Sequence, residues 1–252
     1  MAILDVKHLG KVYEGKVPYT ALNDITFQLE QGEFVAIMGP SGSGKSTLLN
    51  VISTIDRPTA GRVTIAGSDP HTMNDEQLAH FRRNVLGFVF QDFNLVQTLT
   101  VAENIMLPLT LEGVSSDEMT QRTKDMAEWL GIAPLLDKRT FEISGGQAQR
   151  VAVARAVIAK PALLLADEPT GNLDSKATRD VMALFQRLNQ HQQATILMVT
   201  HDAFVASHCQ RVLIIKDGRL YQEIVSSGNQ QAFHQKIVDA MGLLGGGPRD
   251  LI

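Results

Sequence analysis

The sequence predicts an α/β fold with a mixed, largely parallel β-sheet core, an N-terminal antiparallel β-subdomain and an inserted helical subdomain. Three short apolar runs support the prediction of the core: Glu33–Met38, Ala162–Ala166 and Ala194–Val199. Runs of this kind are typical of strands that are buried on both faces of a parallel sheet. Each run lies next to a segment with helical spacing, and strands that alternate with helices indicate a parallel sheet. With 252 residues, of which 44% are hydrophobic and 20% charged, the chain can bury one large core or two small ones.

The N-terminal segments have a different pattern. Leu4–Leu9, Ile25–Leu29 and Arg62–Ala66 alternate apolar with polar residues. This alternation predicts half-buried antiparallel strands, which form the N-terminal β-subdomain. Lys45–Ile55 follows the first apolar run and has the spacing of a helix, and a further strand is predicted at Leu86–Phe90.

The region from Val101 to Lys138 is rich in Glu, Met, Leu and Lys, and Met119–Leu130 within it has helical spacing. We expect this region to be mainly helical and to interrupt the sheet domain. Two more helices are predicted, at Ala148–Ile158 and Lys176–Asn189, before the second and third apolar runs.

The C-terminal part is predicted to contain a hairpin and a helix. Arg211–Ile215 and Arg219–Tyr221 flank Asp217-Gly218, a pair that suits a tight turn. Gln230–Met241 is predicted to be helical, and the glycine-rich tail Gly245–Gly247 to be mobile. We expect one domain over residues 1–252, in which residues 1–95 and 155–228 form the core with its β-subdomain, residues 96–154 the helical subdomain, and residues 229–252 a C-terminal helix and tail.

Composition and charge exclude several classes of protein. The 23 basic and 27 acidic residues give a formal net charge of −4, which argues against non-specific nucleic-acid binding, so no nucleic-acid partner is expected. The single cysteine, Cys209, rules out an intrachain disulfide and fits a reducing compartment. No window approaches the roughly 20 apolar residues of a membrane span, and Met1–Asp5 does not begin a signal peptide. We therefore expect a cytoplasmic protein that reaches the membrane only through a partner.

A phosphate-binding loop is predicted between the first buried strand and the helix that follows it. Residues 39–46 read Gly-Pro-Ser-Gly-Ser-Gly-Lys-Ser and match the pattern G-x-x-x-x-G-K-[ST]. Glycines let successive backbone N–H groups point at phosphates, and the helix that begins near Lys45 adds its positive end. Lys45 can place a charge on the β- and γ-phosphate oxygens, and the Ser46 hydroxyl can ligate Mg²⁺. The candidate nucleotide-binding residues here are Gly39, Pro40, Ser41, Gly42, Ser43, Gly44, Lys45, Ser46 and Thr47.

Two acidic residues close the second apolar run. Asp167 follows the predicted strand Ala162–Ala166, and a carboxylate at the end of a buried parallel strand can reach the Mg²⁺ held by Ser46. Glu168 is then placed to polarise an attacking water. The alternative is that Asp-Glu-Pro only opens a surface turn, but its pairing with the loop at 39–46 favours a nucleotide hydrolase.

A third motif, Ile143–Gln147, precedes the predicted helix Ala148–Ile158. Ser144 can cap that helix, and Gly145 and Gly146 leave backbone N–H groups free. The chain thus has a second helix N-terminus suited to phosphate. One γ-phosphate hardly needs two such ends from one fold, so we expect the second to serve the nucleotide of a neighbouring subunit.

These motifs, in this order and spacing, resemble the ATP-binding subunits of ABC transporters from Leu4 to about Tyr221. The resemblance implies a P-loop ATPase fold of the ABC type, in which Ser144, Gly145, Gly146 and Gln147 belong to the signature motif that contacts ATP. The sequence departs from the family pattern at two positions: Ile143 stands where leucine is usual, and Asn172 where alanine or serine is common. Neither departure removes a group that touches phosphate.

The same resemblance implies further site residues. Gln91 matches the glutamine that ligates Mg²⁺ and senses the membrane partner, and Asn172-Leu-Asp174 matches the D-loop, in which Asp174 contacts the nucleotide site. His201 matches the switch histidine at the γ-phosphate. Tyr13, 26 residues before Gly39, matches the aromatic residue that stacks on adenine, although an aromatic residue in a strand is often packing. The predicted catalytic residues are Glu168, His201 and Gln91, and the predicted metal ligands are Ser46, Gln91 and Asp167.

The resemblance also implies partners. Two copies of the chain are expected to close around two ATP molecules with Mg²⁺, and to drive a membrane permease at the inner face of the cell membrane. Asp167–Gly171, Phe90–Leu95 and Thr98–Asn104 resemble the macrolide and lipoprotein-release branch. Val199–Asp202, Ala206–Cys209 and the C-terminal segment Gly228–Gly246 resemble the antimicrobial-peptide subgroup typified by bacitracin resistance.

For that subgroup the resemblance implies removal of peptide antibiotics from their targets, and signalling to a membrane histidine kinase through the permease. Other classes share the motifs. DNA-repair ATPases need a long coiled-coil insertion that this chain lacks, and translation-type ABC proteins carry two such domains in one chain. A complex of the lipoprotein-release, macrolide-export or cell-division type, acting mechanically or as a regulator, remains an alternative.

Overall fold

A six-stranded sheet forms the centre of the fold, with its strands in the order β5-β6-β7-β3-β8-β9. The computed structural model describes residues 2–245 of the chain. Neighbouring strands from β5 to β8 are parallel, and β9 is antiparallel to β8, so the predicted mixed sheet is confirmed. The strands are β3 (Phe34–Met38), β5 (Leu86–Val89), β6 (Leu163–Asp167), β7 (Ile196–Val199), β8 (Arg211–Lys216) and β9 (Arg219–Val225).

The central strands are buried as the apolar runs predicted. Every residue of β3 and β7 is buried, as are the first four residues of β6. Burial of one such aliphatic side chain contributes about 1.5–3 kcal/mol, so these strands supply much of the core. The register pairs Asp167 on β6 with Val199 on β7, and Val199 with Ile37 on β3. The segments that follow these three strands therefore meet at one edge of the sheet.

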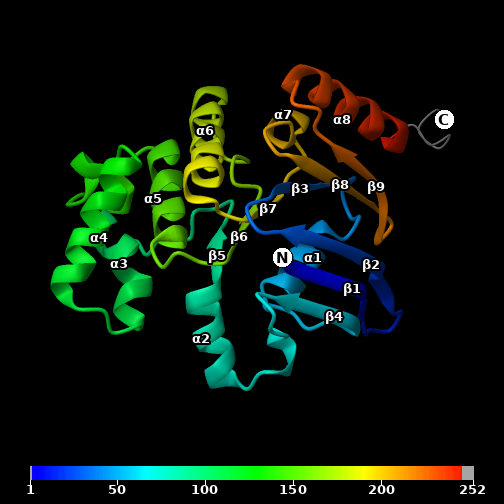
Figure 1. Cartoon of the computed structure of the whole chain (residues 1–252), viewed down its shortest axis with the longest axis horizontal. Helices are drawn as coiled ribbons and strands as arrows, with labels where there is room; N and C mark the ends of the chain where they lie inside the picture. Colours follow the sequence, from blue (N-terminus) through cyan, green and yellow to red (C-terminus); the bar gives the residue numbers. More distant parts are fainter. Residues whose placement is uncertain (1, 246–252) are drawn as a thin grey trace.

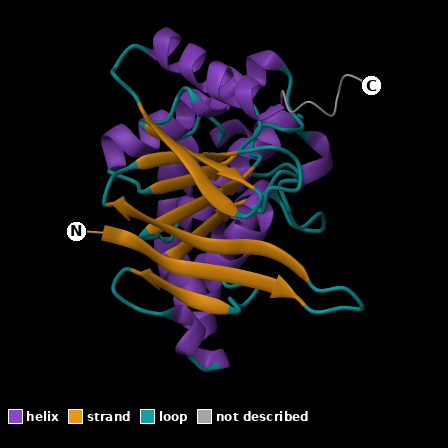
Figure 2. Cartoon of the chain, turned by 90° about the vertical axis from the view of Figure 1, so that its right-hand side faces the viewer, coloured by secondary structure: helices purple, strands orange, loops and turns teal. Residues whose placement is uncertain are grey.

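A second sheet, in the order β2-β1-β4, is antiparallel and lies beside the first (Figure 2). Its strands are β1 (Ala2–Tyr13), β2 (Tyr19–Glu30) and β4 (Ala60–Ile65). β1 and β2 are longer than the sequence predicts, because register shifts, with His8 and Asp24 at positive φ, interrupt the alternation of polar and apolar residues. Helix α1 (Lys45–Ile52) packs between the two sheets, since its apolar residues share one buried cluster with strands of both.

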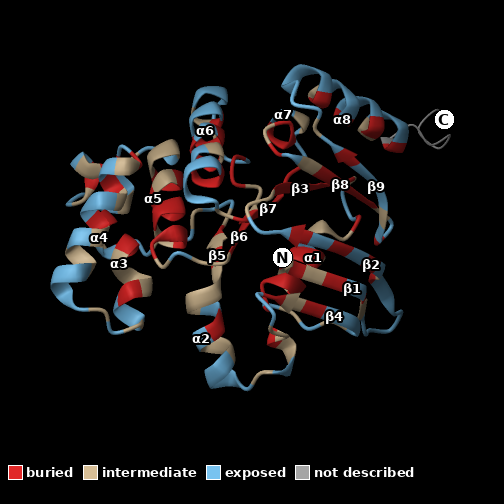
Figure 3. Ribbon diagram, viewed as in Figure 1, coloured by how far each residue is buried: buried red, intermediate tan, exposed pale blue. Residues whose placement is uncertain are grey.

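The helical subdomain lies on one side of the central sheet, and the C-terminal helix lies on the other (Figure 1). Within the subdomain α3 contacts both α4 and α5. Its elements are α3 (Val101–Leu111), α4 (Ser116–Trp129), α5 (Gly145–Val157) and the short turns η2 (Ala133–Leu135) and η3 (Thr140–Glu142). Most of α5 is buried between this subdomain and the core sheet (Figure 3).

The remaining helices frame the core. They are η1 (Pro70–Thr72), α2 (Asp75–Val85), α6 (Ser175–Gln192), α7 (Ala203–Ala206) and α8 (Gln230–Gly245). Helix α2 was not predicted, because it buries only Phe81 and so shows no apolar stripe. Its local signals are the capping box of Asn74 and Gln77, acidic residues in the first turn and basic residues in the last. The β8–β9 hairpin is confirmed, with Asp217 and Gly218 both at positive φ.

At the C-terminus, α8 buries Phe233, Ile237 and Leu244. Gly245 ends α8, and the rest of the tail that the sequence predicts to be mobile lies outside the described residues. Within residues 2–245, no helix is both long and apolar enough to cross a membrane. Cys209 is buried, and burial raises the pKa of its thiol well above the ordinary value.

We expect Asn189→Ala to lower the free energy of unfolding by about 2 kcal/mol. The buried Asn189 amide donates to the carbonyls of Gly32 and Ala194, at 2.7 and 2.9 Å, and so ties α6 to the starts of β3 and β7. Removal of the amide leaves both carbonyls without this donor. Urea unfolding followed by circular dichroism measures the change, with the exposed Gln190→Ala on the same helix as control. Equal stability of the two variants would contradict the role of Asn189.

Candidate functional site

The loop from Gly39 to Gly44 connects β3 with α1 and passes very close to other backbone segments. A Cβ atom on Gly39 would lie 2.0 Å from the Ile215 carbonyl oxygen, and one on Gly44 would lie 2.5 Å from the Ala21 carbonyl oxygen. Both glycines also have positive φ, at 153° and 102°. Only glycine fits either position, so the loop is confined to a single path between β8 and β2.

The turn of the β8–β9 hairpin also contacts this loop. The Gly218 N–H donates to the Ser43 carbonyl at 3.1 Å, and the Gly218 carbonyl accepts from the Asn23 N–H at 2.7 Å. The turn of the hairpin thus bridges the loop and β2. The Ser43 hydroxyl is buried and has no hydrogen-bond partner among the described residues, which marks an unsatisfied polar group inside the loop.

Helix α1 offers free N–H groups to a ligand. Its N-cap is Gly44, which provides no side-chain acceptor, whereas α2 to α6 are all capped by a side chain. Ser46 and Thr47 lie in this first turn, with the Ser46 residue exposed. An uncapped N-terminus behind a glycine-rich loop is an anion-binding arrangement. The predicted nucleotide loop therefore has the backbone geometry that phosphates need.

The Lys45 ammonium lies along the loop and donates to the carbonyls of Gly39 and Pro40, each at 2.9 Å. Partial burial lowers the pKa of Lys45, against the charges of Glu168 and Asp167, which raise it. Asp167 carries the opposite penalty. Burial and then the charge of Glu168 raise the pKa of Asp167, while Lys45 lowers it. Burial therefore penalises the charged forms of both Lys45 and Asp167.

Glu168 and His201 come together at the carboxyl edge of the sheet. Glu168 has a φ of 44°, which is uncommon for a residue with a side chain, and its N–H donates to the Val199 carbonyl at 2.9 Å. Its Oε1 lies 2.9 Å from Nδ1 of His201. The His201 side chain is 72% exposed and that of Glu168 only 16%, so the carboxylate is held in place by a histidine that faces solvent.

The predicted metal ligands suit Mg²⁺. Among the described residues no three His, Cys, Asp or Glu side chains gather as a metal cluster. Ser46, Asp167 and Gln91 instead offer a hydroxyl, one carboxylate and an amide, all hard oxygen donors. Mg²⁺ typically takes one or two carboxylates and fills its remaining positions with water and substrate phosphates, so this sparse donor set fits a metal that enters with a nucleotide.

The motif at 143–147 forms part of a separate pocket of about 400 Å³. Ser144 caps α5 as predicted: its Oγ accepts from the Gln147 N–H at 3.4 Å, and Gln147 Oε1 accepts from the Ser144 N–H at 2.9 Å. Asp174 caps α6 in the same pocket, and hydrogen bonds from the backbone N–H groups of Ala177 and Lys176 lower its pKa. The pocket is lined by residues of 131–132, 144–147, 150, 172–174, 176–177 and 180, and none of them belongs to the loop at 39–47. One chain alone therefore keeps the two phosphate-binding features apart.

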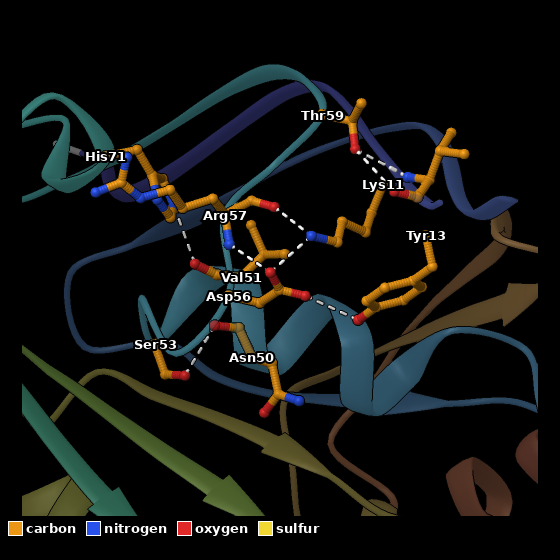
Figure 4. Close-up of polar contacts among 10 residues, drawn as sticks. Lys11, Tyr13, Asn50, Val51, Ser53, Asp56, Arg57, Thr59 and His71 are labelled. Carbon is orange, nitrogen blue, oxygen red and sulfur yellow. Dashed lines mark hydrogen bonds and ion pairs between the residues drawn. The ribbon is translucent and has the colours of Figure 1, made fainter. Parts of the chain in front are cut away.

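Tyr13 ends β1, and the residue is 40% exposed. Figure 4 shows its hydroxyl directed at Asp56. Its hydroxyl donates to Asp56 Oδ2 at 2.8 Å, and the Lys11 ammonium, 2.6 Å from Asp56 Oδ1, lies 4.8 Å from the ring centroid. Burial and the hydrogen bond to Asp56 raise the pKa of the Tyr13 phenol. The ring is thus held at its hydroxyl end, and part of its surface remains available to a base.

Two neighbours of the site were not found from the sequence. Tyr19 pairs with Tyr13 across the β1–β2 hairpin, and its hydroxyl donates to the Gly42 carbonyl at 3.3 Å. Asn172, read only as a departure from the family pattern, exchanges hydrogen bonds with the segment after β5. The position of Tyr19 beside the site follows only from the pairing of β1 with β2. No local sequence signal predicts the contacts of Asn172.

A glycine loop at an uncapped helix, buried carboxylates at the sheet edge and a second capped helix end in a separate pocket define a P-loop ATPase. The family model described as "ABC transporter" matches residues 22–171, and the chain belongs to this family. It is therefore an ABC-type ATPase, which binds ATP with Mg²⁺ and hydrolyses it.

Known proteins are similar to this chain over most of its length. The ABC transporter ATP-binding protein YxdL of Bacillus subtilis is 59% identical over 249 residues, which cover 99% of this chain and 97% of YxdL. The bacitracin export ATP-binding protein BceA of Halalkalibacterium halodurans is 46% identical, with 99% of this chain and 100% of BceA covered. The dimeric post-hydrolysis structure of MJ0796 from Methanocaldococcus jannaschii, bound to ADP and Pi, matches with a TM-score of 0.81 and 39% identity, covering 90% of this chain and 100% of that one.

We expect Asp167→Asn to make the nucleotide-free protein more stable at neutral pH and to abolish hydrolysis. The pKa of Asp167 is raised in the folded chain, so between its ordinary and its raised value the folded state keeps a proton that the unfolded state has lost. The free energy of unfolding therefore falls as pH rises through the raised pKa, and this loss is absent from the variant.

Urea unfolding in the presence of a chelator, at several pH values from 4 to 7, measures the difference between the two proteins. That difference should grow in favour of the variant as pH rises. A constant difference across the pH range would show that burial of the Asp167 charge does not penalise the fold.

Proposed function

We propose that the chain is the ATP-hydrolysing subunit of a bacterial ABC transporter whose permease confers resistance to antimicrobial peptides. The observation that supports this most is the 46% identity with the bacitracin export protein BceA across the whole of both chains. In this proposal the ATPase is cytoplasmic, sits at the inner face of the membrane through the permease, and reaches a membrane histidine kinase only through that permease.

Within the site we propose that residues Gly39–Thr47 hold the phosphates and that Tyr13 stacks on adenine. Lys45 leaves its own loop carbonyls for the β- and γ-phosphate oxygens, a charge-assisted contact that outweighs two neutral ones. Ser46, Asp167 and Gln91 hold Mg²⁺, which neutralises charge on the phosphates when bound. Glu168 orients and deprotonates the attacking water, since its side chain is largely buried and is held by His201, 2.9 Å away.

We propose that two copies form the complete sites. The pocket with Ser144, Gly145, Gly146, Gln147 and Asp174 carries two helix N-termini but no residue of the phosphate loop. A second copy would bring its ATP to this pocket, as the dimeric arrangement of MJ0796 also supports. ATP then favours the closed pair and ADP the open pair, and this difference in affinity can move a bound permease between conformations.

The permease surface in this proposal is a largely apolar groove of about 440 Å³ between α2, β5 and the helical subdomain. Its apolar lining includes Phe88, Phe90, Leu107, Pro108 and Leu111. Phe90 directly precedes Gln91 in the chain. Three arginines line it: Arg83 forms an ion pair with Glu112, whereas Arg82 donates to Thr54 and Arg155 to backbone carbonyls. An apolar groove whose arginines are engaged in hydrogen bonds or an ion pair suits the apolar face of an amphipathic helix.

A complex of the lipoprotein-release, macrolide-export or cell-division type is the second candidate. Similar chains include proteins named for macrolide export and for lipoprotein release, so the ATPase chemistry alone does not separate these cargoes. The features of the C-terminal segment favour the first candidate less strongly than the sequence implied, because Phe233, Ile237 and Leu244 are buried and serve the packing of α8.

Mixing two inactive variants tests the shared sites. Lys45→Ala removes the phosphate cation, and Ser144→Arg blocks the second pocket, so each homodimer has one damaged half in every site. A mixed dimer has one site with both lesions and one with neither. We expect mixtures to regain part of the ATPase activity, or, in a Glu168→Gln background, to regain ATP-induced dimers in size-exclusion chromatography. Sites assembled within one chain would give no recovery in either measurement.

The function itself is tested in cells. We expect a strain whose ATPase carries Glu168→Gln to lose resistance to bacitracin-like peptides, with the permease still bound. Leu111→Glu, which charges a residue 62% exposed in the groove, should lose both the permease in co-purification and the resistance. Leu243→Glu, on α8 and 79% exposed, is the matched control and should lose neither. Unchanged peptide resistance with altered lipoprotein release or macrolide resistance would favour the second candidate.

A further inference from the structure

The segment after β5 is held by side chains from two distant parts of the chain. From one side Arg155 on α5 donates to the carbonyls of Asn94 and Phe93, at 2.7 and 3.0 Å. Phe93 and Asn94 have φ values of 61° and 49°, so the backbone turns sharply there and this anchor keeps the turn in place. From the other side the segment meets Asn172.

Asn172 bonds this segment with both atoms of its amide. Its Nδ2 donates to Asp92 Oδ1 at 2.8 Å and to the Gln91 carbonyl at 3.3 Å, and its Oδ1 accepts from Gln91 Nε2 at 3.4 Å. The Gln91 amide also packs against Gly171, where an added Cβ would lie 3.0 Å from Nε2. Alanine cannot make any of these bonds, and a serine hydroxyl is too short to reach both residues. Asn172, which departs from the family pattern, therefore makes specific contacts that alanine or serine could not make in full.

The contact sets which end of the Gln91 amide is free. Nε2 is engaged by Asn172, and among residues 2–245 no hydrogen bond reaches Oε1 of Gln91. The amide oxygen is the atom that can bind a hard cation, whereas the NH₂ group cannot. If nothing engaged Nε2, the exposed amide could turn over and present its NH₂ group instead. An acceptor at Nε2 thus selects the rotamer that leaves the oxygen available.

We propose that Asn172 is a positioning residue, which orients the Gln91 amide so that its oxygen can bind the metal of the nucleotide site. Asn172 also lines the pocket that contains Ser144 and Asp174. A second copy that binds in this pocket would therefore lie next to the Asn172 side chain. Loading of the metal in one half-site is in this way linked to the interface with the partner copy. The inference rests on the proposed role of Gln91 as a metal ligand.

The test measures metal binding without turnover. Mn²⁺ is titrated into the full chain with a non-hydrolysable ATP analogue, and free Mn²⁺ is read by EPR. We expect Asn172→Ala to weaken Mn²⁺ binding about 10-fold, the scale of a lost partner of a metal ligand. Binding of a fluorescent ATP analogue in EDTA should not change, which also confirms folding. Gln121→Ala removes an exposed amide that bonds Asp125 on α4, and as matched control should leave Mn²⁺ binding unchanged.

A swapped pair provides the rescue. In the double variant Asp92→Asn with Asn172→Asp, a carboxylate at 172 still accepts from Gln91 Nε2, and the 2.8 Å bond to position 92 is restored with donor and acceptor exchanged. Only the longer bond to the Gln91 carbonyl, at 3.3 Å, is lost. We expect this pair to recover Mn²⁺ binding, which a merely structural role of Asn172 in ATP binding would not predict. Failure of the pair to recover, with ATP-analogue binding intact, would overturn the orienting role.

Measurements in the Gln91→Ala variant separate the positioning role of Asn172 from the proposed metal role of Gln91. We expect Gln91→Ala to weaken Mn²⁺ binding and Asn172→Ala to add nothing further, because one residue acts through the other. Additive losses, or a loss for Gln91→Ala with none for Asn172→Ala, would overturn the inference and leave the metal role of Gln91 standing. Unchanged Mn²⁺ binding in Gln91→Ala would overturn the proposed metal role of Gln91, and the inference with it.

Discussion

The site depends on the narrow path of the backbone between β3 and α1. Gly39 and Gly44 pass so close to the carbonyls of Ile215 and Ala21 that a Cβ atom would lie 2.0 and 2.5 Å from them. The loop cannot be displaced without moving β2 or the β8–β9 hairpin, which closes over it through Gly218. Because this path delivers α1 to the sheet edge with its first N–H groups uncapped, the anion site exists before any ligand binds.

The charges around this loop are arranged for ligands rather than for the stability of the free chain. Burial lowers the pKa of Lys45 and raises that of Asp167, so both groups are penalised for being charged. Glu168 adds an unfavourable backbone conformation, with a φ of 44°. Strain and desolvation of this kind are common where a site is preorganised, since the ligand later supplies the missing charges. A nucleotide and its metal bring both a polyanion and a cation to this edge.

Three helix N-termini of the site lie in two separate parts of the chain. The phosphate loop precedes α1, whereas Ser144 and Asp174 cap α5 and α6 in a separate pocket. Between these parts runs the segment after β5, which Arg155 holds from the helical subdomain and Asn172 holds from the core. The apolar groove begins on the same segment, at Phe90 and Asn94. In the proposed function, the permease, the metal and the second copy therefore bind at neighbouring residues, each on its own surface.

Several features could be predicted from local sequence alone: the buried strands, the hairpin turn at Asp217-Gly218, the capping of α5 by Ser144 and the position of the phosphate loop. Each is encoded in local periodicity or in the conformational needs of a few adjacent residues. Local sequence did not reveal α2, which buries only Phe81, or the full length of β1 and β2, where bulges break the alternation. The long-range contacts of the site became visible only in the folded chain. Glu168 and His201 are 33 residues apart, and Gln91 and Asn172 are 81 apart. They meet because β5, β6 and β7 lie side by side and end at one edge, an order that is set by packing of the whole sheet and has no local signature.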